Sequence, residues 1–484
     1  MIGHTTASQI QGLNMAQGHS QAIAQEKRMD SGETRPSEHT RRERHGSDNE
    51  ARTDRTDRRA SQINYFAKRA MEYAGALRNL NNQTVLVTDK MLGIITGQDN
   101  DDLFQGGGYG PGLSISGTDG DDMMMIRARA VQDVNTGAGD DIVSVQARTV
   151  ASVRGQSGDD ALAVLARNVG QVQGDNGDDL IAVVARNINQ VDGGSGDDAI
   201  AVLARNIGGV SGGDGDDTIS VAGREIGNAF SGTGDDTLLV EGREIDRVFG
   251  GEGDDKISVS ARTVKNTGGG DGDDQITVQA RTATYVNGGE GDDMINIAAR
   301  TLHSVNGGTG DDLVNVIAKN IAVVNGDAKL DQVNAAGDLT STTAGGDDMI
   351  NVVADTVGLV HGGGGDDTIS VTANLAGVIN GGRGNDLINL NVDTAMIRVG
   401  GDGGQDAVTV DRAGHLTISF ADTDVQDVEM TWDGDTLTLT GASGESLRIE
   451  NVSNIQELSL IGLGDDGEPL VAQLVQNSGF DLLI

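Results

Sequence analysis

Apolar and polar residues alternate in short segments along most of the chain, and the alternation returns every 19 residues. Ile219 and Val221, for example, stand two positions apart between polar or small neighbours, which is the period of a β-strand with one buried face. A second apolar pair, such as Ile188 and Val191, precedes a glycine-rich turn. The pattern therefore predicts coils that each contain two short strands and two turns.

A Gly-Asp-Asp tripeptide marks the phase of these coils. It starts at Gly120, recurs at every nineteenth residue up to Gly310, and resumes at Gly346. The 36-residue gap between Gly310 and Gly346 predicts one degenerate repeat around residues 326–327. Residues 100–102, Asn-Asp-Asp, resemble a degenerate first repeat.

Such coils must stack, because no single coil can bury its own apolar face. The sequence predicts an all-β fold, a right-handed parallel β-solenoid of the β-roll or β-helix type, with about fifteen coils of 19 residues. A thin core of Val, Ile, Leu and Ala explains why aromatic residues make up only 2% of the chain.

Four segments are expected along the chain. Residues 1–60 are polar with almost no large apolar side chain, which predicts disorder. Residues 61–96 predict an amphipathic helix and a strand that cap the array, and partner docking is the alternative role of the helix. Residues 97–406 hold the repeats. Residues 407–484 lose the period but keep alternating segments and an Asp-Gly turn signal, which predicts a β-rich cap.

Composition narrows the class of partner. The net charge is −39, and residues 1–60 hold ten basic and nine acidic residues, so the acidity belongs to the rest of the chain. This charge argues against nucleic acid and anionic membranes and favours cations as partners. The absence of cysteine excludes disulfides, zinc fingers and thiol nucleophiles. No apolar run has the length of a membrane span, and we expect no Sec-type signal at the N-terminus.

The turn carries the candidate chemistry. Residues 212–220 read Gly-Gly-Asp-Gly-Asp-Asp-Thr-Ile-Ser, and similar segments recur in most units. Glycines let backbone carbonyls turn inward, and carboxylates beside carbonyls form an all-oxygen environment that suits Ca²⁺ better than Mg²⁺. Asp217 has the parity of the buried Ile219, so its side chain should point inward and that of Asp216 outward. The alternative is that these aspartates are solvated and only favour the turn geometry.

The nine residues resemble the calcium-binding nonapeptide of the repeats-in-toxin (RTX) family of secreted bacterial proteins, Gly-Gly-x-Gly-x-Asp-x-apolar-x. The resemblance covers about residues 97–406 in more than a dozen copies. It implies a solenoid that binds several Ca²⁺ ions between neighbouring turns. The metal-ligating residues that it implies are Asp122, Asp141, Asp160, Asp179, Asp198, Asp217, Asp236, Asp255, Asp274, Asp293, Asp312, Asp348, Asp367 and Asp386.

The second turn of each coil departs from the common β-roll. It reads Ala-Arg-Asn-Ile or Ala-Arg-Thr-Val and lacks both the glycines and the aspartate. Calcium is therefore expected along one edge only, at about one ion per coil, in a 19-residue variant similar to those of some RTX adhesins. Bound cations would also offset the repulsion between carboxylates stacked roughly 5 Å apart.

The opposite edge carries a row of basic residues at the second turn. One interpretation is that the arginine stems cover the corner of the solenoid, with Glu225 and Glu244 easing the repulsion. The other is a docking stripe for acidic polysaccharide or for the acidic edge of a second copy of the chain. The row consists of Arg129, Arg148, Arg167, Arg186, Arg205, Arg224, Arg243, Arg262, Arg281, Arg300 and Lys319.

No catalytic role is expected, because the chain has neither a His-Glu-x-x-His nor a Gly-x-Ser-x-Gly motif. The resemblance implies a secreted structural or interaction protein, such as an adhesin, a biofilm-matrix or a surface-layer component, that folds on binding Ca²⁺. Residues 480–484, Phe-Asp-Leu-Leu-Ile, are similar to the C-terminal signal for type I secretion in this family. The alternatives are a secreted enzyme or effector whose repeats serve export and folding, and an ice-binding protein.

Overall fold

The computed structural model describes residues 112–327, 345–399, 404–442, 444–463 and 469–476, and the backbone of residues 85–87, 94–96, 103–108 and 480–483. The chain divides into two units, Met1–Gln83 and Thr84–Ile484, and all described residues lie in the second. The disordered segment and the helix that the sequence predicts before residue 84 therefore lie outside the described residues.

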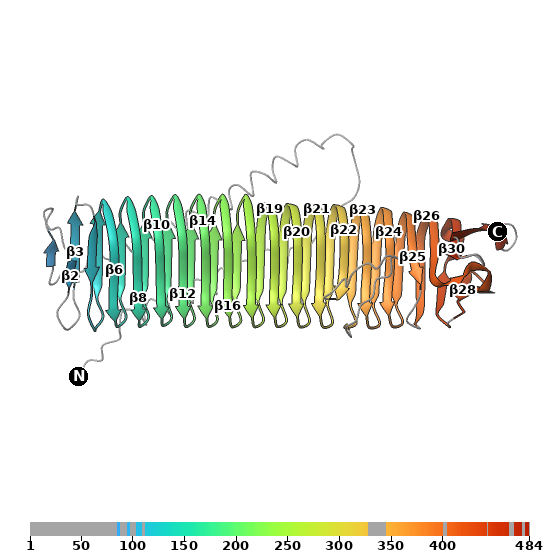
Figure 1. Ribbon diagram of the computed structural model, residues 1–484, viewed down its shortest axis with the longest axis horizontal. Coiled ribbons are helices and arrows are strands. Elements are labelled where there is room, and N and C mark those ends of the chain that lie inside the picture. The colour runs from blue at the N-terminus through green and yellow to red at the C-terminus, as the bar shows by residue number, and fades with distance from the viewer. Residues whose placement is uncertain are drawn as a thin grey trace, which may run out of the picture. The chain divides into compact units, whose positions relative to one another are not determined.

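The unit Thr84–Ile484 is a stack of parallel β-coils (Figure 1). Each strand pairs in register with the equivalent strand of the next coil, so that Ile200 lies opposite Ile219 and Ile207 opposite Ile226. These pairs are 19 residues apart, and about fifteen such coils follow one another. The structure confirms the all-β parallel solenoid.

The first coils contain one short and one long strand each. The short strands are β5 (Met123–Ala128), β7 (Ile142–Gln146), β9 (Ala161–Leu165), β11 (Leu180–Val184), β13 (Ala199–Leu203), β15 (Thr218–Ala222) and β17 (Thr237–Glu241). The long strands are β6 (Ala130–Ala138), β8 (Thr149–Ser157), β10 (Asn168–Asn176), β12 (Asn187–Ser195), β14 (Asn206–Asp214), β16 (Glu225–Thr233) and β18 (Glu244–Glu252). Later coils join the two into one strand: β19 (Lys256–Asp271), β20 (Gln275–Glu290), β21 (Met294–Thr309), β22 (Leu313–Asp327), β23 (Met349–Gly364), β24 (Thr368–Arg383) and β25 (Leu387–Val399).

The core lies between the two strands of every coil. Ile219 and Val221 of β15 are buried, and so are Ile226 and Ala229 of β16. Stacked on their equivalents in the neighbouring coils, they form continuous apolar rows, which a single coil could not cover. The predicted alternation of buried and exposed positions is thereby confirmed.

Parallel pairing begins before the first Gly-Asp-Asp motif. Strand β1 (Val85–Val87) pairs with β3 (Leu103–Gly108), and β2 (Ile94–Thr96) pairs with β4 (Leu113–Ser116). Strand pairing requires backbone hydrogen bonds and alternating side chains rather than the glycine turn, so coils can precede the motif.

The prediction of a degenerate repeat around residues 326–327 is wrong. Strand β22 pairs directly with β23, with Leu313 opposite Met349, so no further coil separates them. The 36-residue step combines one ordinary coil with additional residues in the connection between Asp327 and Gly345. The length of a gap in the repeat does not show whether the gap contains a further coil or an insertion in a turn. Such an insertion costs little free energy.

The stack continues beyond residue 406, where the sequence period ends. Strand β26 (Gln405–Asp424) pairs in parallel with β25, and β29 (Ser446–Glu450) and β30 (Ile455–Leu463) pair in parallel with β26. The antiparallel strands β27 (Glu429–Asp433), β28 (Thr436–Thr440), β31 (Pro469–Gln476) and β32 (Phe480–Leu483) and the short 3₁₀ helices η2 (Val425–Asp427) and η3 (Val452–Asn454) complete this end. The predicted Asp-Gly turn joins β27 to β28, and Gly434 has a φ of 63°.

Candidate metal centre along one edge

Close backbone approaches between coils shape the Gly-Asp-Asp edge. Gly213 and Gly215 have φ angles of 132° and 123°, in the region that favours glycine. A Cβ atom on Gly213 would also lie less than 3.0 Å from the carbonyl oxygen of Gly194, its equivalent in the preceding coil. Glycine is therefore required by the backbone conformation and by the available space.

The inner aspartate row consists of the second aspartate of each motif. Its members point inward, as parity predicts, and only 0–2% of each side chain is exposed. The backbone N–H of each member before Asp386 donates to the Oδ1 atom of the next member, as from Asp198 to Asp217 at 2.8 Å. All fourteen residues singled out from the sequence belong to this row: Asp122, Asp141, Asp160, Asp179, Asp198, Asp217, Asp236, Asp255, Asp274, Asp293, Asp312, Asp348, Asp367 and Asp386.

The second carboxyl oxygen, Oδ2, faces a small space that we call the oxygen cradle. In the coil of Asp217, the oxygen cradle lies over Gly212. An added Cβ atom on Gly212 would come within 3.0 Å of Asp217 Oδ2 and of the Ser231 carbonyl oxygen of the next coil. The buried Oδ2 atom has no hydrogen-bond partner among the described residues. Ten coils share both features, with the cradle at Gly155, Gly174, Gly193, Gly212, Gly250, Gly269, Gly288, Gly307, Gly326 and Gly362.

The inner aspartates have strongly shifted pKa values. Burial, followed by repulsion from neighbouring carboxylates, raises the pKa of Asp217 to about 8 and that of Asp367 to about 9. The pKa values of Asp141 and Asp236 rise only to about 6, because the hydroxyl group of Thr136 or Ser231 lies beside the carboxylate and favours its charged form. Without a cation, the row therefore tends to retain protons near neutral pH.

The donor set of the cradle fits a hard cation. No group of three or more acidic or histidine side chains in the described part of the chain could hold a metal, so carboxylates would have to act together with backbone carbonyls. Each cradle offers both kinds of oxygen, buried and facing the same space. Carboxylate and carbonyl oxygens without nitrogen or sulfur are the ligands typical of Ca²⁺.

The outer aspartates form a second row with a structural role. Asp216 is exposed, as predicted, but its Oδ1 atom accepts a hydrogen bond of 2.9 Å from the backbone N–H of Asp235 in the next coil. The same contact recurs along the edge, as from Asp159 to Asp140 at 3.0 Å. The sequence predicts only the outward direction of these side chains, although their constant spacing could have suggested the contact between coils.

Asp327 adds a buried carboxyl group that the sequence analysis did not assign. It stands opposite Gly308, at a position where most coils have glycine, and it is only 2% exposed. Its Oδ2 atom accepts a hydrogen bond of 2.7 Å from the backbone N–H of Gly364. Its charge contributes to the raised pKa values of Asp348 and Asp367. The available signal was the missing glycine beside the gap in the repeat.

The arginine row lies at the other turn of the coils. Backbone hydrogen bonds connect its members, as from Arg205 to Arg186 at 3.1 Å. Arg224 and Arg243 lie 3.9 and 3.8 Å from the neighbouring Glu225 and Glu244, which agrees with the predicted easing of repulsion. Such exposed pairs contribute little to stability.

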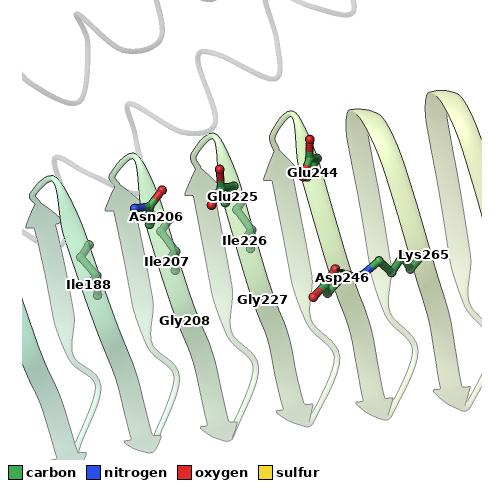
Figure 2. Close-up of a pocket in the computed structure, with 10 residues that line it drawn as sticks. All are labelled: Ile188, Asn206, Ile207, Gly208, Glu225, Ile226, Gly227, Glu244, Asp246 and Lys265. Atoms are coloured by element: carbon green, nitrogen blue, oxygen red, sulfur yellow. Dashed lines mark ion pairs between the residues drawn. The ribbon is translucent and has the colours of Figure 1, made fainter.

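A shallow hollow of about 510 Å³ lies on the long strands, and no residue of the aspartate rows lines it (Figure 2). Gly208 and Gly227 leave room at its centre, and Glu225 and Glu244 lie near the turn. The amine of Lys265 lies 2.6 Å from Asp246. The hollow contains no group that resembles the oxygen cradles.

Comparisons with known proteins give the chain no family. Neither a protein-family model nor a curated protein matches it. Among the described residues, no helix has the length and apolarity that crossing a membrane requires. The repeat and the geometry of the aspartate rows are therefore the features that bear on function.

Proposed function

We propose that this chain is a calcium-binding solenoid that acts outside the cell as a structural or interaction protein, such as an adhesin, a matrix or a surface-layer component. The observation that carries the proposal is the row of ten cradles, each with a buried carboxylate oxygen that lacks a hydrogen-bond partner beside a carbonyl oxygen of the next coil. Buried polar atoms in native proteins are almost always satisfied, so a repeated exception indicates a ligand.

The inner aspartates and the carbonyl oxygens of the cradle glycines would hold the ions. Bound there, Ca²⁺ would supply the positive charge that offsets the buried carboxylates. The chain itself fixes the position of each carboxylate through the N–H to Oδ1 hydrogen bonds, such as the 2.8 Å bond from Asp255 to Asp274. Glycine at the cradle keeps the space open.

Secretion is proposed on the resemblance to RTX proteins and on the C-terminal Phe-Asp-Leu-Leu-Ile segment. Modules that bind Ca²⁺ outside cells commonly do so with dissociation constants of about 0.1–1 mM, which simple carboxylate and carbonyl sites can reach. The exposed arginine row is the proposed contact surface for a second copy of the chain or for an acidic polysaccharide.

Calorimetric titration of the full-length chain tests the proposal. CaCl₂ should give saturable binding of several ions per chain, and MgCl₂ should bind more weakly because Mg²⁺ gives up its water reluctantly. Replacing Asp198, Asp217 and Asp255 by Asn should reduce the number of ions bound. The matched control replaces Asp197, Asp216 and Asp254 of the outer row. Absence of calcium binding by the unmodified chain would contradict the proposal.

A further inference from the structure

Two coils of the inner aspartate row have no glycine at the cradle position. The cradle residue is glycine in all ten cradle coils and stands three positions before Gly-Asp-Asp in nine of them, the exception being Gly326. In the coils of Asp141 and Asp236, Thr136 and Ser231 occupy this position. Both side chains are 0% exposed. Their hydroxyl groups are therefore enclosed at the level of the inner aspartate row.

The hydroxyl of Ser231 lies between the two oxygens that flank a cradle. Its Oγ atom donates a hydrogen bond of 3.3 Å to the carbonyl oxygen of Gly250 in the next coil. The same hydroxyl lies beside the carboxyl group of Asp236, its own coil's inner aspartate. In the preceding coil, Gly212 leaves the equivalent space open between Asp217 and the Ser231 carbonyl.

Thr136 repeats this arrangement near the N-terminal end of the array. Its hydroxyl donates to the carbonyl oxygen of Gly155 in the next coil and lies beside the carboxyl group of Asp141. Two coils that are far apart in the array thus place a hydroxyl between the inner carboxyl group and the carbonyl oxygen of the next coil.

We propose that Thr136 and Ser231 occupy the cation position in their coils, so that these two coils bind no metal and divide the row of sites. Four cradles, from Gly155 to Gly212, lie between the two hydroxyls, and six, from Gly250 to Gly362, follow Ser231. The inference rests on the proposed calcium function and adds to it the number and grouping of the ions.

The chemistry of the hydroxyl supports this role. A cation in the cradle would bind the carbonyl oxygen and the carboxylate together, and the hydroxyl already contacts both groups. Because it is part of the chain, it remains in place when calcium is removed. In the two coils with a hydroxyl, this contact with the next coil therefore does not depend on calcium.

Native mass spectrometry of the full-length chain in saturating calcium tests the proposal by counting ions. Ser231→Gly removes the side chain and opens the cradle, so it should bind one more Ca²⁺ ion than the unmodified chain. Ser231→Ala is the matched control: it also loses the hydroxyl, but its Cβ atom still fills the space, so its ion count should not change. Thr136→Gly should independently gain one ion, which covers the case in which Ser231→Gly does not fold.

Three outcomes would overturn the inference in distinguishable ways. If folded Ser231→Gly and Thr136→Gly bind the same number of Ca²⁺ ions as the unmodified chain, the two side chains do not block a cation site. Loss of an ion in Ser231→Ala would show that the hydroxyl is itself a calcium ligand. Absence of calcium from the unmodified chain would overturn the proposed function together with this inference, whereas the first two outcomes leave the calcium function standing.

Discussion

The backbone N–H of Asp217 donates a hydrogen bond of 2.6 Å to Oδ1 of Asp236, one coil further along the chain. In the outer row the direction is reversed, because Asp216 accepts from the N–H of Asp235 in the following coil. Both rows therefore connect neighbouring coils, but only the inner row also presents a buried second oxygen. This difference separates a structural aspartate from a candidate metal ligand.

The loss of stability in Asp217→Ala should depend on calcium, whereas the loss in Asp216→Ala should not. With calcium, Asp217→Ala should remove one ion and leave the buried N–H of Asp198 without its acceptor, a cost of about 1–3 kcal/mol before the loss of the metal is counted. Asp216→Ala should cost about 0.5–1.5 kcal/mol, because its contact is exposed to water. In chelator, the cost of Asp217→Ala should shrink, since a buried and repelled carboxyl group is lost.

Calorimetric unfolding in calcium and in EDTA measures these differences. The cost of Asp216→Ala should be similar in both solutions. Equal dependence on calcium for the two variants would contradict the assignment of metal binding to the inner row.

The stability of the calcium-free protein should fall as the pH rises. An unfolded aspartate ionises near pH 4, whereas Asp160 and Asp217 keep their protons up to about pH 8 in the folded chain. A pKa raised by folding stabilises the protein below the unfolded pKa, and this contribution is lost as the pH rises from about 4 to about 8. Thermal unfolding in EDTA at pH 4, 6 and 8 should therefore show a decreasing midpoint.

The variant with Asp160, Asp217 and Asp255 replaced by Asn provides the control for this pH series. It should show a weaker pH dependence, because three of the shifted groups no longer titrate. A midpoint that rises with pH in EDTA would contradict the raised pKa values.

Gly213 on the metal edge should be far less tolerant of an added side chain than Gly209 on the long strand β14. Gly213→Ala places a Cβ atom against the Gly194 carbonyl at a φ of 132° and should cost at least about 1–3 kcal/mol. Gly209→Ala is the matched control, since a Cβ atom there meets nothing within 4 Å and should change stability by less than about 0.5 kcal/mol. Denaturant unfolding of the two variants makes the comparison, and similar losses would show that the turn geometry is wrong.

Calcium-dependent association between copies of the chain is expected through the two charged edges. The arginine row of one copy would meet the outer aspartates of another, and many weak contacts at the same repeat would add. Light scattering should show association in calcium at low salt, dispersal at about 0.5 M salt, and none when Arg186, Arg205 and Arg224 are changed to Glu. A monodisperse monomer at high protein concentration, low salt and saturating calcium would leave the row as a solvated corner.

The sequence alone predicts the coil and the orientation of its side chains. A strict period forces equivalent residues to stack, and strand parity places Asp217 inward beside Ile219, as the structure shows. These features follow from local alternation and from the period, and both can be counted in the sequence.

Other features depend on contacts between coils, which the period does not specify. The interpretation of the 36-residue step required the pairing of Leu313 with Met349. The roles of Asp216 and Ser231 required the hydrogen bonds across the coil interface. Parallel pairing beyond residue 406 was not apparent, because strands without the glycine turn carry only ordinary alternation.

Circular dichroism of the full-length chain in millimolar calcium and in excess EDTA tests the calcium-dependent solenoid most directly. The ligands converge only when coils stack, so removal of the ions should leave a row of carboxyl groups that only bound protons can neutralise. At pH 9, above the raised pKa of about 8 of Asp217, most of the β-sheet signal should be lost in EDTA and should return when calcium is added back. A β-sheet signal and a thermal midpoint that are the same in EDTA as in calcium would contradict the account.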